Sequence, residues 1–413
     1  MTVSASATEL QIDDDLARRN ALLLAAAQAL GGANASIVIS LGGLTGVYLL
    51  GEDKSLATLP ITAMVLGIAA GALPAGQLMR RVGRRAGFII GALVGFCAAV
   101  GATLAVIAGS FALFCFASFF SGIYGAFVHQ YRFAAADTAS ERFKPKAISW
   151  VMAGGILAGI IGPQTVIHTK DLLNPLMFAG AYVGQAVLTV LTIGVLVFLK
   201  IPKLPAVQRR ASGRPILTIM RQRGFIIAAT SGICAYALMN YVMTAAPLAM
   251  VACGFTAADA ALGIQWHILA MFGPSFFTGS LIARYGKVRI VTIGFIMLAG
   301  CGVVALQGIE LVHFWGALIL LGLGWNFAFI GATAMVTDTY RPEERNKVQA
   351  ANDFLVFGFV AIASLASGKT LNAYGWDAIN YLIFPVTGFC VLLLLLSAWT
   401  GDKPDPRTGS SVT

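Results

Sequence analysis

Long apolar runs separated by short polar or Pro/Gly breaks fill most of the chain. Each run has roughly 20 residues, which is the length a helix needs to cross about 30 Å of hydrocarbon. The pattern therefore predicts an all-α integral membrane protein with twelve transmembrane helices. The expected spans are 21–49, 57–79, 86–108, 112–136, 147–168, 176–199, 224–250, 259–282, 290–308, 314–336, 348–368 and 378–399.

Composition agrees with a membrane protein. The 413 residues are 58% hydrophobic and 11% charged, with a mean hydropathy of +0.82. A soluble protein carries about a quarter charged residues. A chain with so little polar surface is therefore expected to be embedded in the bilayer.

The basic residues indicate the orientation. Nearly all of the 28 Lys and Arg lie before the first span or in the loops that follow each even-numbered span. Basic loops stay in the cytoplasm, so both termini are expected there, in a multi-pass protein of the inner membrane. The net charge of +10 thus indicates topology and contact with anionic lipid, and no nucleic-acid partner is expected.

Two short sequences recur about half a chain apart. "GQLMRRVG" (76–83) follows the second span and "GSLIARYG" (279–286) follows the eighth; "DTASERFKPK" (137–146) likewise matches "DTYRPEERNK" (338–347). Two such internal repeats predict a pair of six-helix halves in parallel orientation. The expected division is a cytoplasmic segment 1–20, a first half 21–199, a basic linker 200–223, a second half 224–400 and a cytoplasmic tail 401–413.

The two glycine-arginine loops resemble the signature loop of the major facilitator superfamily. We expect Gly83 and Gly286 to allow a tight reversal, and Gly76 and Gly279 to permit close helix approach. The acid that the family usually has in this loop is replaced by Arg80 and Ala283. The resemblance implies a transporter, expected to be a monomer, whose first, fourth, seventh and tenth helices line a central cavity. The signature residues are Gly76, Arg81, Gly83, Arg84, Gly279, Arg284 and Gly286.

Polar side chains cluster on those same four spans. A polar group in the membrane is costly unless it faces protein or water, so these spans should face inward. Amide, phenol, imidazole and indole groups suit a small organic solute with an aromatic or heterocyclic part. The alternative is that they only cross-link helices. The candidate substrate contacts are Gln28, Asn34, Tyr124, His129, Asn240, Tyr241, Trp325 and Asn326.

Two charged residues stand out within the spans. Arg132 lies in the fourth span and Asp353 in the eleventh, at similar depth and from opposite halves. We expect an ion pair that forms when the halves close at the cytoplasmic face and separates when they open. Three alternatives remain: Arg132 reaches the cytoplasm by snorkelling, Arg132 holds an anionic group of the substrate, or Arg80 pairs with Asp353 instead.

These features predict a secondary active transporter that moves a small organic solute by alternating access. A multidrug/proton antiporter is the alternative within that class, and a non-transporting receptor or scaffold is the alternative from another class. The chain has no nucleophile–base or metal-ligand pattern, so no enzyme, cofactor or metal is expected. The expected partners are the solute and the lipid bilayer, with a coupling proton as a further candidate.

Overall fold

A computed structural model describes residues 14–399 apart from 52–53, 137–138, 141–142, 202–212 and 342–343. Every element in this described part is a helix. The helices before the linker are α1 (Asp14–Leu50), α2 (Leu59–Val82), α3 (Arg84–Ile107), α4 (Phe111–Val128), α5 (Tyr131–Ala136), α6 (Lys144–Thr169) and α7 (Ala179–Val197).

The linker contains the short helix α8, and the rest of the chain follows it. These helices are α8 (Ile216–Met220), α9 (Arg223–Ala252), α10 (Ala257–Phe272), α11 (Ser275–Tyr285), α12 (Lys287–Ala305), α13 (Leu311–Val336), the 3-10 helix η1 (Thr337–Thr339), α14 (Arg345–Tyr381) and α15 (Ile383–Trp399).

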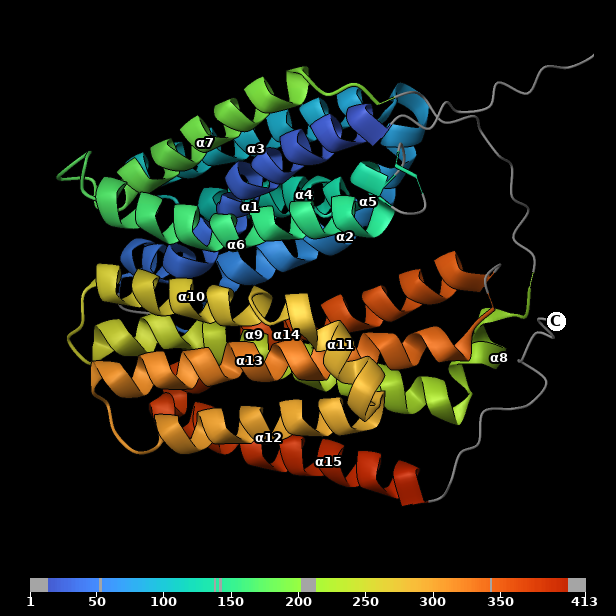
Figure 1. The fold of residues 1–413 in the computed structure, drawn as a ribbon. Coiled ribbons are helices and arrows are strands. Elements are labelled where there is room, and N and C mark those ends of the chain that lie inside the picture. Colours follow the sequence, from blue (N-terminus) through green and yellow to red (C-terminus); the bar gives the residue numbers. More distant parts are fainter. Residues whose placement is uncertain are drawn as a thin grey trace, which may run out of the picture.

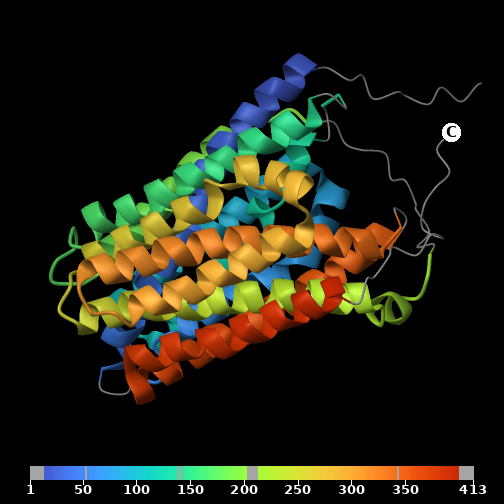
Figure 2. The same cartoon turned by 60° about the horizontal axis from the view of Figure 1, so that its bottom comes forward.

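The helices gather in two groups that lie against each other. Helices α1 to α7, the first group, lie on one side of Figure 1, and α9 to α15, the second group, lie on the other. Between the groups, α6 packs along α10 and α2 packs along α14. Both views show α1 beginning and α15 ending at the end of the bundle that carries α5 and α8, called here the α5 end (Figures 1 and 2). The opposite end is called the far end.

Among the described residues, ten helices are long and apolar enough to cross a membrane, or eleven if the bent pair α10–α11 counts as one span. The described part thus confirms a multi-span helical protein but not the count of twelve. The last two expected spans, 348–368 and 378–399, fall in one apolar stretch, Lys347–Ser397. Gly375 interrupts that stretch with a non-helical backbone (φ 79°, ψ −174°) that favours glycine.

Two other expected spans are broken inside the bundle. The fourth, 112–136, is interrupted by a turn at His129 and Gln130, so Arg132 lies on the separate helix α5. The eighth, 259–282, bends by 41° between α10 and α11. Pro274 directly precedes α11 there, and proline has no backbone N–H to continue the hydrogen-bond ladder of α10.

The signature loops make the expected reversals. Gly83 and Gly286 have φ values of 90° and 87°, and each ends one helix and begins the next. The expected close approach at Gly76 and Gly279 is wrong for this structure, because no atom lies within 4 Å of a Cβ built at either glycine. Both glycines face open space, so no neighbouring helix uses their small size.

The signature arginines lie at the α5 end. Arg81 is exposed, Arg84 is half-buried, and the Arg284 guanidinium lies 5.3 Å from the ring centre of Tyr285. The side chain of Arg80 lies outside the described part. Whether Arg80 pairs with Asp353 therefore stays a prediction.

Candidate functional site

An aromatic cluster lies inside the second group where it faces the first. The Tyr236 ring on α9 stands nearly perpendicular to Trp325 and Phe329 of α13, with centroids 5.3 and 5.0 Å away. Trp325 and Phe329 stack on each other at 5.1 Å and 15°. Phe357 of α14 also packs edge-on against Tyr236, at 5.8 Å. Flat apolar faces in these orientations suit a planar ring ligand.

The cluster borders the first group. Val65 of α2 belongs to the same apolar cluster as Val356 and Val360 of α14, and Tyr236 and Phe329 pack against it. The aromatic rings therefore lie at the interface between the two helix groups. That is where a site reached alternately from the two sides of the membrane has to be.

One polar atom in the cluster has no partner. The Trp325 indole Nε1 is buried and makes no hydrogen bond to any described residue. An unpaired buried donor costs about 1–3 kcal/mol. A ligand carbonyl placed against the cluster would satisfy this N–H and recover that cost.

Two opposite charges lie beside the aromatic rings. Asp353 lies on α14 in the second group, one helical turn before Phe357, and Arg132 lies on α5 in the first group. The two are close enough to act electrostatically on each other and on Tyr236. Both are exposed, and within the described part no ion pair of 4.0 Å or less joins them. Since both act on an interior ring, they face the interface between the groups, where water can reach them.

Tyr236 was not among the contacts predicted from the sequence. The structure makes Tyr236 the centre of the cluster, in contact with three other rings. Its position four residues before Asn240, on the same helix face, was the signal that could have identified it. Asn240 is buried on α9 and accepts a hydrogen bond of 3.4 Å from Thr244.

Asn326, expected to contact a solute, instead fastens the break between α10 and α11. Its Nδ2 donates to the Met271 carbonyl (2.6 Å) and to Ser275 Oγ (2.8 Å), and its Oδ1 accepts from Thr278 Oγ1 (2.6 Å). The amide thereby replaces bonds that the helix loses at the break. No donor of Asn326 is left for a ligand in this conformation.

Two candidates in the first group are also used inside that group. Asn34 donates to Ser121 Oγ (2.7 Å) and accepts from Gln185, which joins α1, α4 and α7. Tyr124 is fully buried, and its ring fills the space that a Cβ would need at Gly31 and Gly95. Both side chains act as packing or cross-linking residues here.

The remaining candidates are spread over the bundle. Gln28 is half-buried on α1 beside Gly154 of α6, and His129 is exposed at the end of α4. Tyr241 is buried, and its carbonyl accepts a bond of 2.6 Å from Ser367 of α14. Of the eight candidate contacts, only Trp325 is part of the aromatic cluster.

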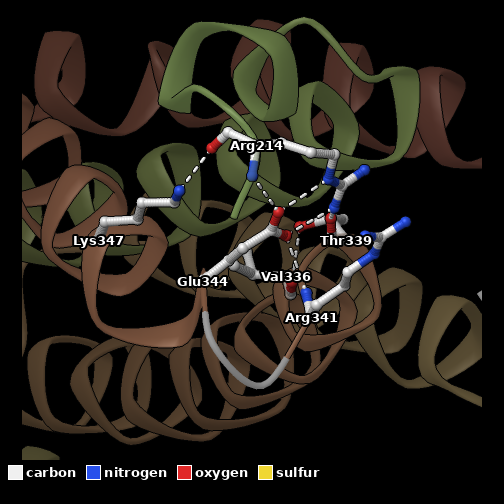
Figure 3. Close-up of polar contacts among 6 residues, drawn as sticks. All are labelled: Arg214, Val336, Thr339, Arg341, Glu344 and Lys347. Atoms are coloured by element: carbon white, nitrogen blue, oxygen red, sulfur yellow. Dashed lines mark hydrogen bonds and ion pairs between the residues drawn. The ribbon is translucent and has the colours of Figure 1, made fainter. Parts of the chain in front are cut away.

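A separate polar cluster holds the end of the linker on the second group (Figure 3). Glu344 is fully buried, and its two carboxylate oxygens accept from the Arg214 side chain at 2.9 and 2.7 Å. The backbone N–H groups of Arg214 and Arg341 also donate to it, at 2.8 and 3.0 Å. These bonds from Arg214 lower the pKa of Glu344 to about 2, from a usual value of 4.5. The cluster is a structural anchor at the α5 end.

Neutral hydrogen bonds join the two groups at the far end. Thr58 Oγ1 donates to the Ser364 carbonyl (3.0 Å), and Thr62 Oγ1 donates to Ser364 Oγ (3.0 Å). Between α6 and α10, Gln164 Nε2 donates to Gln265 Oε1 (2.9 Å). These three bonds cross the interface without any charged group. The far end is therefore closed in this structure.

The described part contains no group of three or more His, Cys, Asp or Glu side chains placed to hold a metal ion. The six cysteines are free thiols. The aromatic cluster, with the unpaired indole N–H and the two charges, remains as the arrangement with binding chemistry.

Comparison with known proteins agrees with a transporter. The sequence profile described as "Major Facilitator Superfamily" matches residues 21–359 and 275–412. A riboflavin transporter, RfnT of Brucella anthropi, is 50% identical over 386 residues, which are 93% of this chain and 97% of that protein. An uncharacterized transporter of the same type, YdeG of Bacillus subtilis, is 29% identical over 92% of this chain and 91% of its own length. The drug efflux pump JefA of Mycobacterium tuberculosis is 25% identical over 35% of this chain and 29% of its own.

A family profile that matches along the chain, and a relative that is 50% identical over 93% of it, are much stronger evidence of family membership than a shared loop motif. They also indicate that the aromatic cluster belongs to a transporter of a small organic solute and not to an enzyme. This chain belongs to the major facilitator superfamily, as a multi-pass secondary transporter of a small organic solute.

Proposed function

We propose that the solute is riboflavin or a closely related flavin. The observation that carries the proposal is the 50% identity, over 93% of the chain, to a riboflavin transporter. The aromatic cluster supports it, because the flat isoalloxazine ring of a flavin can stack on the Tyr236, Trp325 and Phe329 faces. The substrate contacts we propose are these three residues with Phe357.

We propose that the chain crosses the bacterial inner membrane twelve times, as two six-helix halves with both termini in the cytoplasm. The stretch Lys347–Ser397 has 51 residues, about 76 Å as a helix and more than twice the thickness of the hydrocarbon. Two spans meeting at Gly375 account for that length. The α5 end carries the basic loops and would face the cytoplasm.

In this orientation the structure corresponds to the inward-facing state. The far end, on the outer side, is closed by the bonds of Thr58, Thr62 and Gln164, while Arg132 and Asp353 are separated at the α5 end. Alternating access would close the α5 end by bringing these two charges together. The pair would then stabilise the outward-facing state.

Counterflow in proteoliposomes tests the function. Vesicles containing the purified protein and loaded with riboflavin should accumulate labelled external riboflavin, whichever direction operates in the cell, and Trp325→Ala should reduce the rate at least tenfold. Trp315→Ala is the matched control, because Trp315 bonds to the Asp259 carbonyl (3.2 Å) away from the cluster. Counterflow of unrelated drugs without riboflavin would favour a multidrug antiporter, and no counterflow of any solute would favour a receptor or scaffold.

A further inference from the structure

The polar groups beside the aromatic cluster form an unusual set. Trp325 offers a buried indole N–H without a partner, Arg132 offers a guanidinium, and Asp353 offers a carboxylate. Trp325 packs against the Tyr236 ring, and Asp353 lies one helical turn before Phe357, which packs against the same ring. Arg132, from the other group, is close enough to act on Tyr236 electrostatically. The set thus contains two kinds of donor and one acceptor next to flat aromatic faces.

Such a set matches one edge of a particular class of ring. A cyclic imide presents a carbonyl, an N–H and a second carbonyl in a row, which is acceptor, donor, acceptor. The pyrimidine side of a flavin carries this edge as its C2 carbonyl, N3–H and C4 carbonyl. Its complement is donor, acceptor, donor, and charged partners make the stronger bonds of this kind.

We propose that the site recognises the imide edge of the ring: the Trp325 Nε1 and Arg132 guanidinium donate to the two carbonyls, and the Asp353 carboxylate accepts from the N–H between them. This deepens the proposed function and rests on it. These three residues do not bind the ribityl chain of riboflavin. The recognised class is therefore the isoalloxazine imide, with or without the sugar-alcohol tail.

The two helix groups share the recognition. Arg132 belongs to α5 in the first group, while Trp325 and Asp353 belong to α13 and α14 in the second. A bound imide would bridge the two charges and take the place of their direct attraction. Flavin binding and closure of the α5 end are then coupled through the same side chains.

A binding series with three flavins tests the proposal on the full-length protein in nanodiscs. Riboflavin, lumiflavin (which lacks the ribityl chain) and N3-methylriboflavin (which lacks the N–H) are titrated, and quenching of flavin fluorescence gives each Kd. Riboflavin and lumiflavin should bind within about threefold of each other. N3-methylation should weaken binding at least about tenfold, since an unpaired group costs about 1–3 kcal/mol and 1.4 kcal/mol is tenfold in affinity.

Variants separate this recognition from a steric effect of the methyl group. In Asp353→Ala, the ratio of the two Kd values for N3-methylriboflavin and riboflavin should fall toward one. Trp325→Phe keeps a ring but removes the N–H, and it should weaken both flavins at least about fivefold, whereas Trp315→Phe should change neither. The inference is overturned if riboflavin binds and N3-methylation costs nothing, or costs the same in Asp353→Ala. If no flavin binds the wild-type protein, the proposed function itself has failed.

Discussion

At the far end of the bundle, Thr58 and Thr62 bond to Ser364 and Gln164 bonds to Gln265, all across the interface between the helix groups. At the α5 end, the two groups carry the opposite charges of Arg132 and Asp353, and no ion pair of 4.0 Å or less joins them in the described part. One end uses short neutral hydrogen bonds between buried or half-buried groups. The other uses charges that water can reach.

Each kind of interaction suits the change that its end has to make: the far end is closed and must open, while the α5 end is open and must close. Neutral hydrogen bonds act only near 3 Å, so the far end is either bonded or released. Charges act over several ångströms and are screened by salt, so the α5 end can begin to close before contact. Closure at the two ends is therefore expected to respond differently to salt and to small changes in packing.

Charge reversal at the α5 end should give the largest effect. Arg132→Asp or Asp353→Arg alone leaves two like charges facing each other, and an unpaired charge within a span costs about 2.5–3.5 kcal/mol at the centre, so transport should fall about a hundredfold. The double reversal restores opposite charges, so counterflow should rise above that of either single variant, but it should stay below about a tenth of the wild-type rate, because the exchange also swaps the donor and the acceptor that face the flavin.

The same experiment identifies the alternative partners of Asp353. Recovery by Arg80→Asp with Asp353→Arg, and not by the Arg132 pair, would show that Arg80 is the partner of Asp353 when the α5 end closes. If neither double variant recovers but riboflavin binding is lost in Arg132→Asp, Arg132 acts on the ligand only. In either case the proposed contrast between the two ends would need a different pair.

A smaller effect is expected from overfilling the far end. A Cβ at Gly368 would lie 2.4 Å from Thr58 Oγ1, so Gly368→Ala should push α2 from α14 and favour the released state. Counterflow should fall about three- to tenfold, and a cysteine at position 62 should become more reactive to a water-soluble thiol reagent. Gly358→Ala on the same helix is the matched control, because a Cβ there meets no atom within 4 Å. Equal effects of the two substitutions would show that the contact at Gly368 does not hold the far end.

The smallest effect on transport should come from the linker anchor, because its bonds join the linker end to the second group and do not cross the interface. Because Arg214 lowers the pKa of Glu344 to about 2 from 4.5, the anchor's contribution to stability is complete above about pH 4.5 and is lost as the pH falls toward 2. Glu344→Gln should lower the Tm by a few degrees at pH 7 and flatten its fall between pH 4.5 and 3, while counterflow changes less than twofold. A large loss of counterflow at an unchanged Tm would mean that the anchor takes part in gating.

The sequence alone determined that this is a multi-span membrane protein and where its two signature loops reverse. Span length, the asymmetry of basic loops and the repeated loops are local properties, and they require no knowledge of which helices touch. The reversals at Gly83 and Gly286 followed from the same loops, because a positive φ is a property of one residue. The transporter class implied by the resemblance of these loops to the superfamily signature is confirmed by the relatives.

Tertiary structure alone decided what each polar side chain does. Asn326 and Trp325 are neighbours on α13, yet Asn326 is fully bonded at the α10–α11 break while the Trp325 N–H is left without a partner. Successive residues on a helix point about 100° apart, so one faces its own group and the other lies in the aromatic cluster at the interface. A polar side chain inside the membrane is costly without a partner. Whether that partner is another helix or a solute depends on what lies opposite the side chain, and the sequence of one span does not specify this.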